Sequence, residues 1–383
     1  MLRNPRDRPT RSSLHHGTNG TIRDPMCALA LARRLGCLSA VALGCAAAAG
    51  AQESVAVLRG SVFTANGDRI PYALLRLSPS LSQRFTDERG QFVLAPVAPG
   101  TYRLEVRQVG FQPFDTSITV GASGVTLRVA LQPVAIQLTA VTVTTERRCT
   151  NPGPPDAARD PTLASIFAQV RENAERFAVL ADSYPFRYLI ARSFTDSDER
   201  GVVTWSLRDT VEYRSNARAR YRPGSVVGFG PGPGGGRARV MNLPGLPDLA
   251  DSAFHANHCF AFGGVVERDG ARLVRVVFRA AESLRNPDID GEVDLDQTSF
   301  QVRHATIRLT RASRALPGTL SVASSVGFAE LYPNIVVPTQ VSGTLVPVVN
   351  LRVRDRIARY DEEQHLIHVH FLRPLPSAWN IGP

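Results

Sequence analysis

Histidine is the residue type in this sequence best suited to catalysis or metal binding, and three copies fall close together. His365, His368 and His370 lie in the segment Gln-His-Leu-Ile-His-Val-His-Phe. On a β-strand His368 and His370 would share one face, and two imidazoles spaced in this way can ligate zinc or copper. The apolar residues between them favour exposed histidines on a half-buried strand. We therefore predict no metal site and keep His365, His368 and His370 as the candidates.

A second, looser group consists of His255, His258 and Cys259. A zinc carboxypeptidase needs His-x-x-Glu and a distant His, and no His in the sequence is followed by Glu three positions later. The Gly-x-Ser-x-Gly motif of many serine hydrolases is also missing from the sequence. We therefore expect no catalytic residues, no cofactor and no enzymatic activity. The alternative is an unrecognised metal-dependent hydrolase that uses the histidines of both groups.

Carboxylates are concentrated in one short stretch that contains Asp288, Asp290, Asp294 and Asp296. Oxygen ligands suit calcium, but the spacing lacks the third ligand that precedes the glycine of an EF-hand loop. We expect a turn that leads into a strand with an acidic solvent face. The segment 228–236, rich in glycine and proline, predicts a mobile loop, because no strand-loop-helix pattern surrounds it.

Residues 1–51 have the three parts of a secretory signal: the pair Arg33 and Arg34, an apolar stretch over 35–49, and small residues up to Ala51. The apolar stretch is shorter than the roughly 20 residues that a spanning helix needs. We therefore expect a signal peptide that is cleaved after Ala51.

Two further features of this segment bear on export. A natural start at Met26 would remove the polar residues that precede the signal. Cys45 lies in a faint lipoprotein box, so peripheral or lipid-anchored membrane association is an alternative to a freely soluble product.

The mature chain would keep two cysteines, Cys149 and Cys259. A pair of cysteines in an oxidising compartment predicts a disulfide. Such a bond would close a loop of about 110 residues and stabilise the fold by about 4 to 5 kcal/mol. Two unpaired, buried thiols are the alternative.

The net charge of +10 does not indicate a nucleic-acid-binding protein. Half of it lies in residues 1–51, which hold seven Arg and two acidic residues, and the chain contains no Lys. We expect no nucleic-acid partner, because half of the excess charge is removed with the signal and the exclusive use of Arg is more typical of GC-rich codon bias than of selection for phosphate contacts.

Residues 52–132 consist of short alternating runs separated by turn residues such as Asn66-Gly67 and Pro99-Gly100. About seven strands without a helix predict a β-sandwich. Several spaced positions together resemble the carboxypeptidase regulatory-like (transthyretin-like) family: Gly60, Val62, Gly67, Pro71, Ala73, the segments 86–92 and 99–102, Gly110 and Phe111. The resemblance implies a module without catalytic residues that accompanies other domains of secreted and surface proteins. Because the fold is shared with starch-binding domains, it also implies glycan binding.

A proline- and glycine-rich linker is expected over 133–160, and a β-rich domain of unknown function over 161–374, followed by a tail over 375–383. Asp160 and Pro161 predict the start of one amphipathic helix that ends before Pro185. The residues beyond it predict a meander of strands, with 202–207 and 211–221 as separate strands. The predicted fold is mainly β: a seven-stranded sandwich, then a curved sheet or half-barrel with the helix on its concave face.

These observations predict a secreted, non-catalytic binding or structural protein of the periplasm, outer membrane or cell surface. Its ligand would be a glycan, a protein or a lipid of the envelope. The order of elements in the second domain is similar to that of periplasmic lipoprotein-carrier domains, so a lipid or lipoprotein carrier is an alternative.

Overall fold

The computed structural model describes residues 56–79, 82–134, 148–215, 221–242, 246–332, 335–348 and 357–374. The predictions for the signal segment, Met26, Cys45, residues 135–147 of the linker and the tail lie outside these residues. These described residues belong to one compact unit. None of the helices in the described ranges has the length and apolarity needed to cross a membrane.

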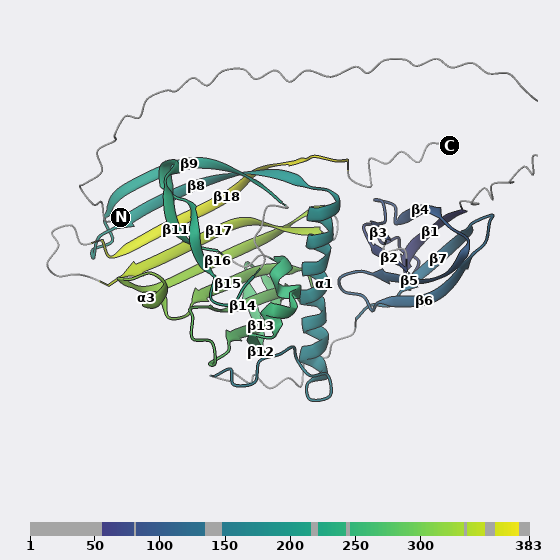
Figure 1. The fold of residues 1–383 in the computed structure, drawn as a ribbon, viewed down its shortest axis with the longest axis horizontal. Helices are drawn as coiled ribbons and strands as arrows, with labels where there is room; N and C mark the ends of the chain where they lie inside the picture. The colour runs from purple at the N-terminus through teal and green to yellow at the C-terminus, as the bar shows by residue number, and fades with distance from the viewer. Residues whose placement is uncertain are drawn as a thin grey trace, which may run out of the picture. The chain divides into compact units, whose positions relative to one another are not determined.

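The first domain is a sandwich of two small sheets, and it contains no helix among its described residues (Figure 1). One sheet has the order β4-β1-β7 and the other β3-β2-β5-β6. Leu58, Leu75 and Leu104 lie between them without exposed surface. The strands are β1 (Ala56–Thr64), β2 (Leu74–Ser78), β3 (Ser82–Phe85), β4 (Gln91–Val97), β5 (Gly100–Arg107), β6 (Phe114–Val120) and β7 (Val125–Leu131).

One long helix, α1 (Pro161–Ser183), precedes the second sheet. The Asp160 carboxylate accepts the Leu163 backbone N–H at 2.8 Å and so caps the first turn, with proline at the start of the helix. The apolar side of α1, which includes Ile166, Val170 and Leu180, is buried against the sheet. Helix start, length and buried face agree with the sequence-based prediction.

The second sheet has nine strands in the order β12-β13-β14-β15-β16-β17-β18-β8-β9, all antiparallel (Figure 1). Strands β12 to β18 follow one another as a meander, whereas the hairpin β8–β9 pairs with the far end of it through β18. The prediction of one helix beside a large curved sheet is confirmed. The strands are β8 (Phe186–Ser197), β9 (Val203–Arg214), β12 (His258–Arg268), β13 (Ala271–Ala280), β14 (Ile289–Asp296), β15 (Val302–Leu309), β16 (Thr319–Tyr332), β17 (Ile335–Pro347) and β18 (Arg359–Phe371).

Two local predictions for this domain were wrong. Residues 203–214 form one continuous strand, β9, so the segments 202–207 and 211–221 are not separate strands. Residues 228–236 form part of a hairpin rather than a mobile loop. The Arg192 guanidinium fastens this hairpin to the sheet. It donates to both Asp209 carboxylate oxygens at 2.8 Å and to the Pro231 carbonyl at 3.0 Å. The hairpin consists of β10 (Val227–Pro231), η2 (Pro233–Gly235) and β11 (Arg237–Met241), and the short helices η3 (Leu246–Ala250), α2 (Ser252–His255) and α3 (Ala312–Ala315) complete the domain.

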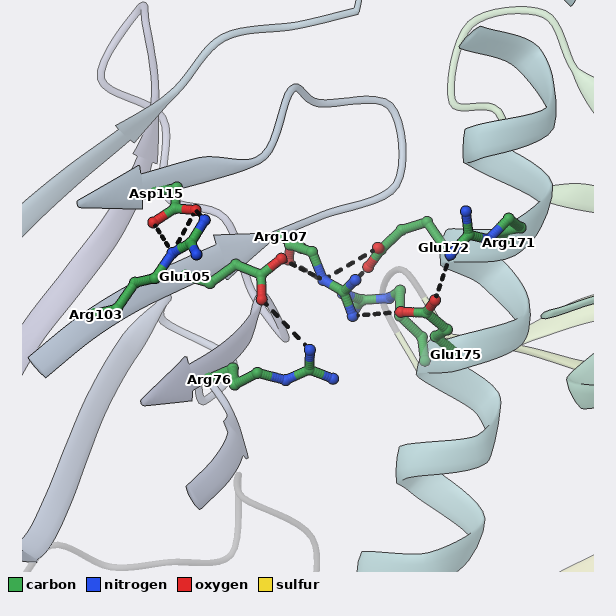
Figure 2. Close-up of polar contacts among 9 residues, drawn as sticks. Arg76, Arg103, Glu105, Arg107, Asp115, Arg171, Glu172 and Glu175 are labelled. Carbon is green, nitrogen blue, oxygen red and sulfur yellow. Dashed lines mark hydrogen bonds and ion pairs between the residues drawn. The ribbon is translucent and has the colours of Figure 1, made fainter. Parts of the chain in front are cut away.

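The sandwich and α1 are joined by a buried ionic cluster (Figure 2). Arg107 of β5 pairs with Glu172 at 3.4 Å and with Glu175 at 2.6 Å. Arg176 is fully buried and donates to the Tyr72 carbonyl. Burial raises the pKa of Glu172, partly offset by the charges of the two arginines, and burial lowers the pKa of Arg176 to about 10.

Candidate functional site

The three histidines of the terminal strand lie on the outward face of β18. His365, His368 and His370 are exposed, while Val369 and Phe371 pack toward the core. The register slips between Leu366 and His368, yet His368 and His370 share a face, as predicted. Throughout the described ranges, no group of three or more His, Cys, Asp and Glu side chains is arranged to hold a metal ion.

The second histidine group is part of the interior. Cys259 is bonded to Cys149 in a disulfide. The His258 ring is buried, with one nitrogen 2.8 Å from the Phe254 carbonyl oxygen and the other 3.0 Å from that of Ile289. Burial lowers the pKa of His255, whose ring contacts a backbone carbonyl. These contacts hold α2 and β12 together.

The four aspartates serve separate structural roles, and the prediction of an acidic solvent face was wrong for two of them. Asp288 has no exposed surface and accepts the Tyr221 hydroxyl at 2.7 Å. Asp294 is 1% exposed, because Arg275 on the neighbouring strand covers it with hydrogen bonds of 2.6 and 2.8 Å. Arginine on an adjacent strand therefore converts an outward-facing carboxylate into a buried one.

An open pocket of about 490 Å³ lies on the sheet face opposite the α1-packed core. This volume is in the range of small-ligand sites. The hairpin β12–β13 and strands β15, β16 and β17 contribute its lining, which includes Arg268, Arg303, His304, Ser325, Thr339 and Gln340.

Two β-bulges explain why polar side chains gather there. On β15, Asp294 pairs with His304 and Leu295 with Val302, so Arg303 is an extra residue. Thr339 is the corresponding extra residue on β17. A bulge changes the direction of side chains and is frequent beside binding sites. Both bulges therefore turn additional polar side chains toward this pocket.

The hollow itself comes from a glycine. Gly327 of β16 pairs with His304 on one side and with Gln340 on the other. A Cβ atom at Gly327 would meet nothing closer than 3.6 Å, the distance to the Gln340 Cβ. The pocket therefore lies over Gly327, which has no side chain, between the side chains of His304 and Gln340 on the two neighbouring strands.

The floor of the pocket contains a chain of polar contacts. The Ser325 Oγ lies 2.5 Å from His304 Nε2, and the Arg268 guanidinium lies 3.1 Å from the same nitrogen. His304 Nδ1 faces the Asp294 carboxylate at 3.7 Å. Burial raises the pKa of Asp294, but the hydrogen bonds from Arg275 outweigh it, so the net shift is downward.

Two arginines, Arg268 and Arg303, outnumber the one carboxylate in the pocket lining, that of Asp269. Arg303 forms no hydrogen bond or ion pair of its own with the rest of the described chain, and Arg268 contacts His304 and, at 3.9 Å, Asp294. Sequence reasoning singled out Asp294 but missed His304, Ser325 and Arg303. Arg303 and His304 come from β15 and Ser325 comes from β16, and only the bulged register brings them together with Asp294 of β14.

Comparison with known proteins identifies the first domain. Residues 57–132 match the carboxypeptidase regulatory-like domain family. The chain therefore carries one domain of this family, which confirms the resemblance seen in the sequence. The match covers the sandwich and not the domain that contains the pocket.

The remaining comparisons are distant. No curated protein sequence matches the chain. A solved DUF1329 family protein from Desulfovibrio piger is 10% identical with a TM-score of 0.31, and the alignment covers 56% of this chain and 96% of that one. A solved LolA superfamily protein from Nitrosomonas europaea is 12% identical with a TM-score of 0.28, covering 55% and 94%. Likeness at this level carries no argument about the ligand.

Proposed function

We propose that this chain is an exported envelope protein whose larger domain binds a small anionic ligand, with the regulatory-like domain as an accompanying module. The observation that carries the proposal is the gap at Gly327, rimmed by Arg268 and Arg303. The Arg303 guanidinium makes no hydrogen bond or ion pair with another described residue, although its charge attracts the Asp296 carboxylate. Its planar guanidinium is suited to bidentate recognition of a carboxylate.

The other lining groups favour a sugar acid as the ligand. Hydroxyl and amide groups of Thr339 and Gln340 can exchange hydrogen bonds with sugar hydroxyls. We therefore propose a carboxylate-bearing envelope glycan. The disulfide supports an oxidising compartment, and hence a location in the periplasm, at the outer membrane or on the cell surface.

A lipid or lipoprotein carrier is the competing proposal, since one helix lies on a curved sheet. A carrier needs apolar room between these two elements. Here Ile166, Leu180 and Val274 have no exposed surface, and Val170 and Val276 have only 2%. The described side chains already fill the face that an acyl chain would occupy, so we favour the polar pocket.

The test is calorimetric titration of the exported protein with glucuronate and, in parallel, with glucose. We expect glucuronate alone to bind, and Arg303→Gln to weaken it about tenfold or more, because a charged hydrogen bond contributes about 1.5 to 3 kcal/mol. Gly327→Leu should abolish binding by filling the gap.

Arg208→Gln is the matched control, since Arg208 is exposed on the same sheet face but outside the pocket. Equal or absent binding of the two sugars would overturn the proposed ligand. Acyl chains that co-purify with the protein and are found by mass spectrometry would support the carrier instead.

A further inference from the structure

Ser325, His304 and Asp294 lie in line across three neighbouring strands. Asp294 of β14 is opposite His304 of β15, and His304 is opposite Gly327 of β16. Ser325 is two residues before Gly327 and therefore points to the same face. The order along this line is hydroxyl, imidazole, carboxylate, at distances of 2.5 and 3.7 Å.

The contacts of His304 define its tautomer. Arginine can only donate hydrogen bonds, so the Arg268 contact requires Nε2 to be an acceptor. The ring proton is then on Nδ1, which is buried and has no hydrogen-bond partner among the described residues. Asp294 is the acceptor nearest to it. This is the tautomer in which Nε2 can take a proton from Ser325.

The Asp294 carboxylate is fixed in position beside the His304 ring. Asp294 is 1% exposed and accepts two hydrogen bonds from Arg275. It stays ionised because these bonds favour the charged form. A buried, fixed negative charge beside Nδ1 orients the ring and stabilises it once it is protonated. Asp294 is therefore a positioning residue that acts through His304.

We propose that Ser325 is an activated nucleophile that cleaves short acyl esters, with acylated anionic sugars as the substrate class. The inference rests on the proposed binding function, because the sugar acid must first occupy the pocket. It goes beyond that function, since it assigns the pocket a reaction.

The reaction proceeds in two balanced halves. The Ser325 oxygen bonds to the acyl carbon as its proton passes to His304 Nε2, and the ester C–O bond then breaks with return of that proton to the leaving alkoxide. Water adds to the acyl carbon and gives a proton to Nε2. The bond to Ser325 breaks, the serine oxygen takes this proton, and the carboxylic acid leaves.

The rim arginines have two tasks in this reaction. Arg303 holds the substrate carboxylate, and Arg268 can turn its guanidinium from His304 toward the negative charge that develops on the acyl oxygen. That movement also leaves the Nε2 lone pair to Ser325 alone. The rim and the nucleophile therefore act on the same bound ester.

The sequence predicts no enzyme because familiar hydrolase motifs are absent, but a triad is defined by geometry and not by the order of residues. Here each member comes from a different strand of one meander. No short motif can report such an arrangement.

The experiment treats the exported protein with a fluorophosphonate probe and measures its intact mass and labelled peptide, alongside turnover of 4-nitrophenyl acetate. We expect one adduct, at Ser325, and a fall in turnover of about 100-fold or more in Ser325→Ala. Ser321→Ala is the matched control, because Ser321 is exposed on the same strand and face but lies outside the pocket. It should keep labelling and turnover within about threefold.

Each outcome bears on one proposal separately. Glucuronate binding without labelling at Ser325 would overturn the nucleophile and leave the binding function standing. Labelling at Ser325 without glucuronate binding would support the nucleophile and refute the proposed ligand. An adduct that persists in Ser325→Ala would place the reactive group elsewhere and end the proposal.

Discussion

The disulfide between Cys149 and Cys259 should contribute a large part of the stability of the second domain. The bond joins residues 110 positions apart and fastens the end of the linker to β12. Two backbone hydrogen bonds of 2.9 Å, from Glu282 to the Cys149 carbonyl and from Gly153 to the His258 carbonyl, hold the same segment. This single disulfide therefore closes a loop of 110 residues in the unfolded chain as well as in the folded one.

Replacing both cysteines by serine removes this constraint from the unfolded chain. The chain-entropy relation for a loop of this length gives a loss of about 5 kcal/mol. Domains are commonly stable by only about 5 to 15 kcal/mol. The variant should thus unfold at a much lower urea concentration, and the slope of the unfolding free energy against urea should rise, because its denatured state is more expanded.

The assay is urea unfolding without reductant, followed by the fluorescence of Trp205, which lies on β9 of the second sheet. Wild-type protein with reductant provides the control for the serine substitutions. A loss below about 1 kcal/mol with an unchanged slope would refute the loop-closure argument. A thiol titration that finds two free groups in the exported protein would refute the bond itself.

For three further substitutions the structure predicts the direction in which the free energy of unfolding changes. Arg192→Met should lower the free energy of unfolding by about 3 kcal/mol, because the Asp209 carboxylate loses its charged partner and keeps only the Gly234 backbone N–H. Urea unfolding measures this loss, and the rate of hydrogen exchange should rise over 227–241. The pKa of Asp294 is lowered in the fold, so its contribution to stability is present above the unfolded value of 3.8 and lost as pH falls through the folded pKa. Unfolding free energies of Asp294→Asn and wild type should differ at pH 7 and converge at low pH. The pKa of Glu172 is raised, so its contribution is present below 4.5 and lost as pH rises through the folded pKa; in Glu172→Gln this dependence should vanish from the same titration.

Elements dominated by local signals could be predicted from the sequence. The cap at Asp160, the proline after it and the apolar spacing of α1 act within a few turns of one helix. The sandwich is signalled by turn glycines such as Gly67 and Gly90, both with positive φ. The alternation of apolar and polar residues in β7 likewise indicates a strand, because it has a period of two.

The errors and omissions arose where a distant residue decides the local structure. Residues 228–236 look mobile until Arg192, on another strand, binds their carbonyl groups. Asp294 looks solvated until Arg275 covers it. The pocket depends on strand register. The two bulges add Arg303 and Thr339 to the lining that His304 and Gln340 form beside Gly327. Register across strands is a tertiary property and leaves little trace in a single sequence.

The pairing of β8 with β18 has a consequence for the order of folding. The first strand of the nine-stranded sheet forms its ladder with the last, from Phe186 opposite Phe371 to Ser197 opposite Arg359. Helix α1 and the meander β12–β18 rely mostly on near neighbours in sequence, whereas this ladder must close a very long loop, and such contacts form slowly. We therefore expect addition of the hairpin β8–β9 to be the last and rate-limiting step. Until then β18 presents an unpaired strand edge that another chain can join.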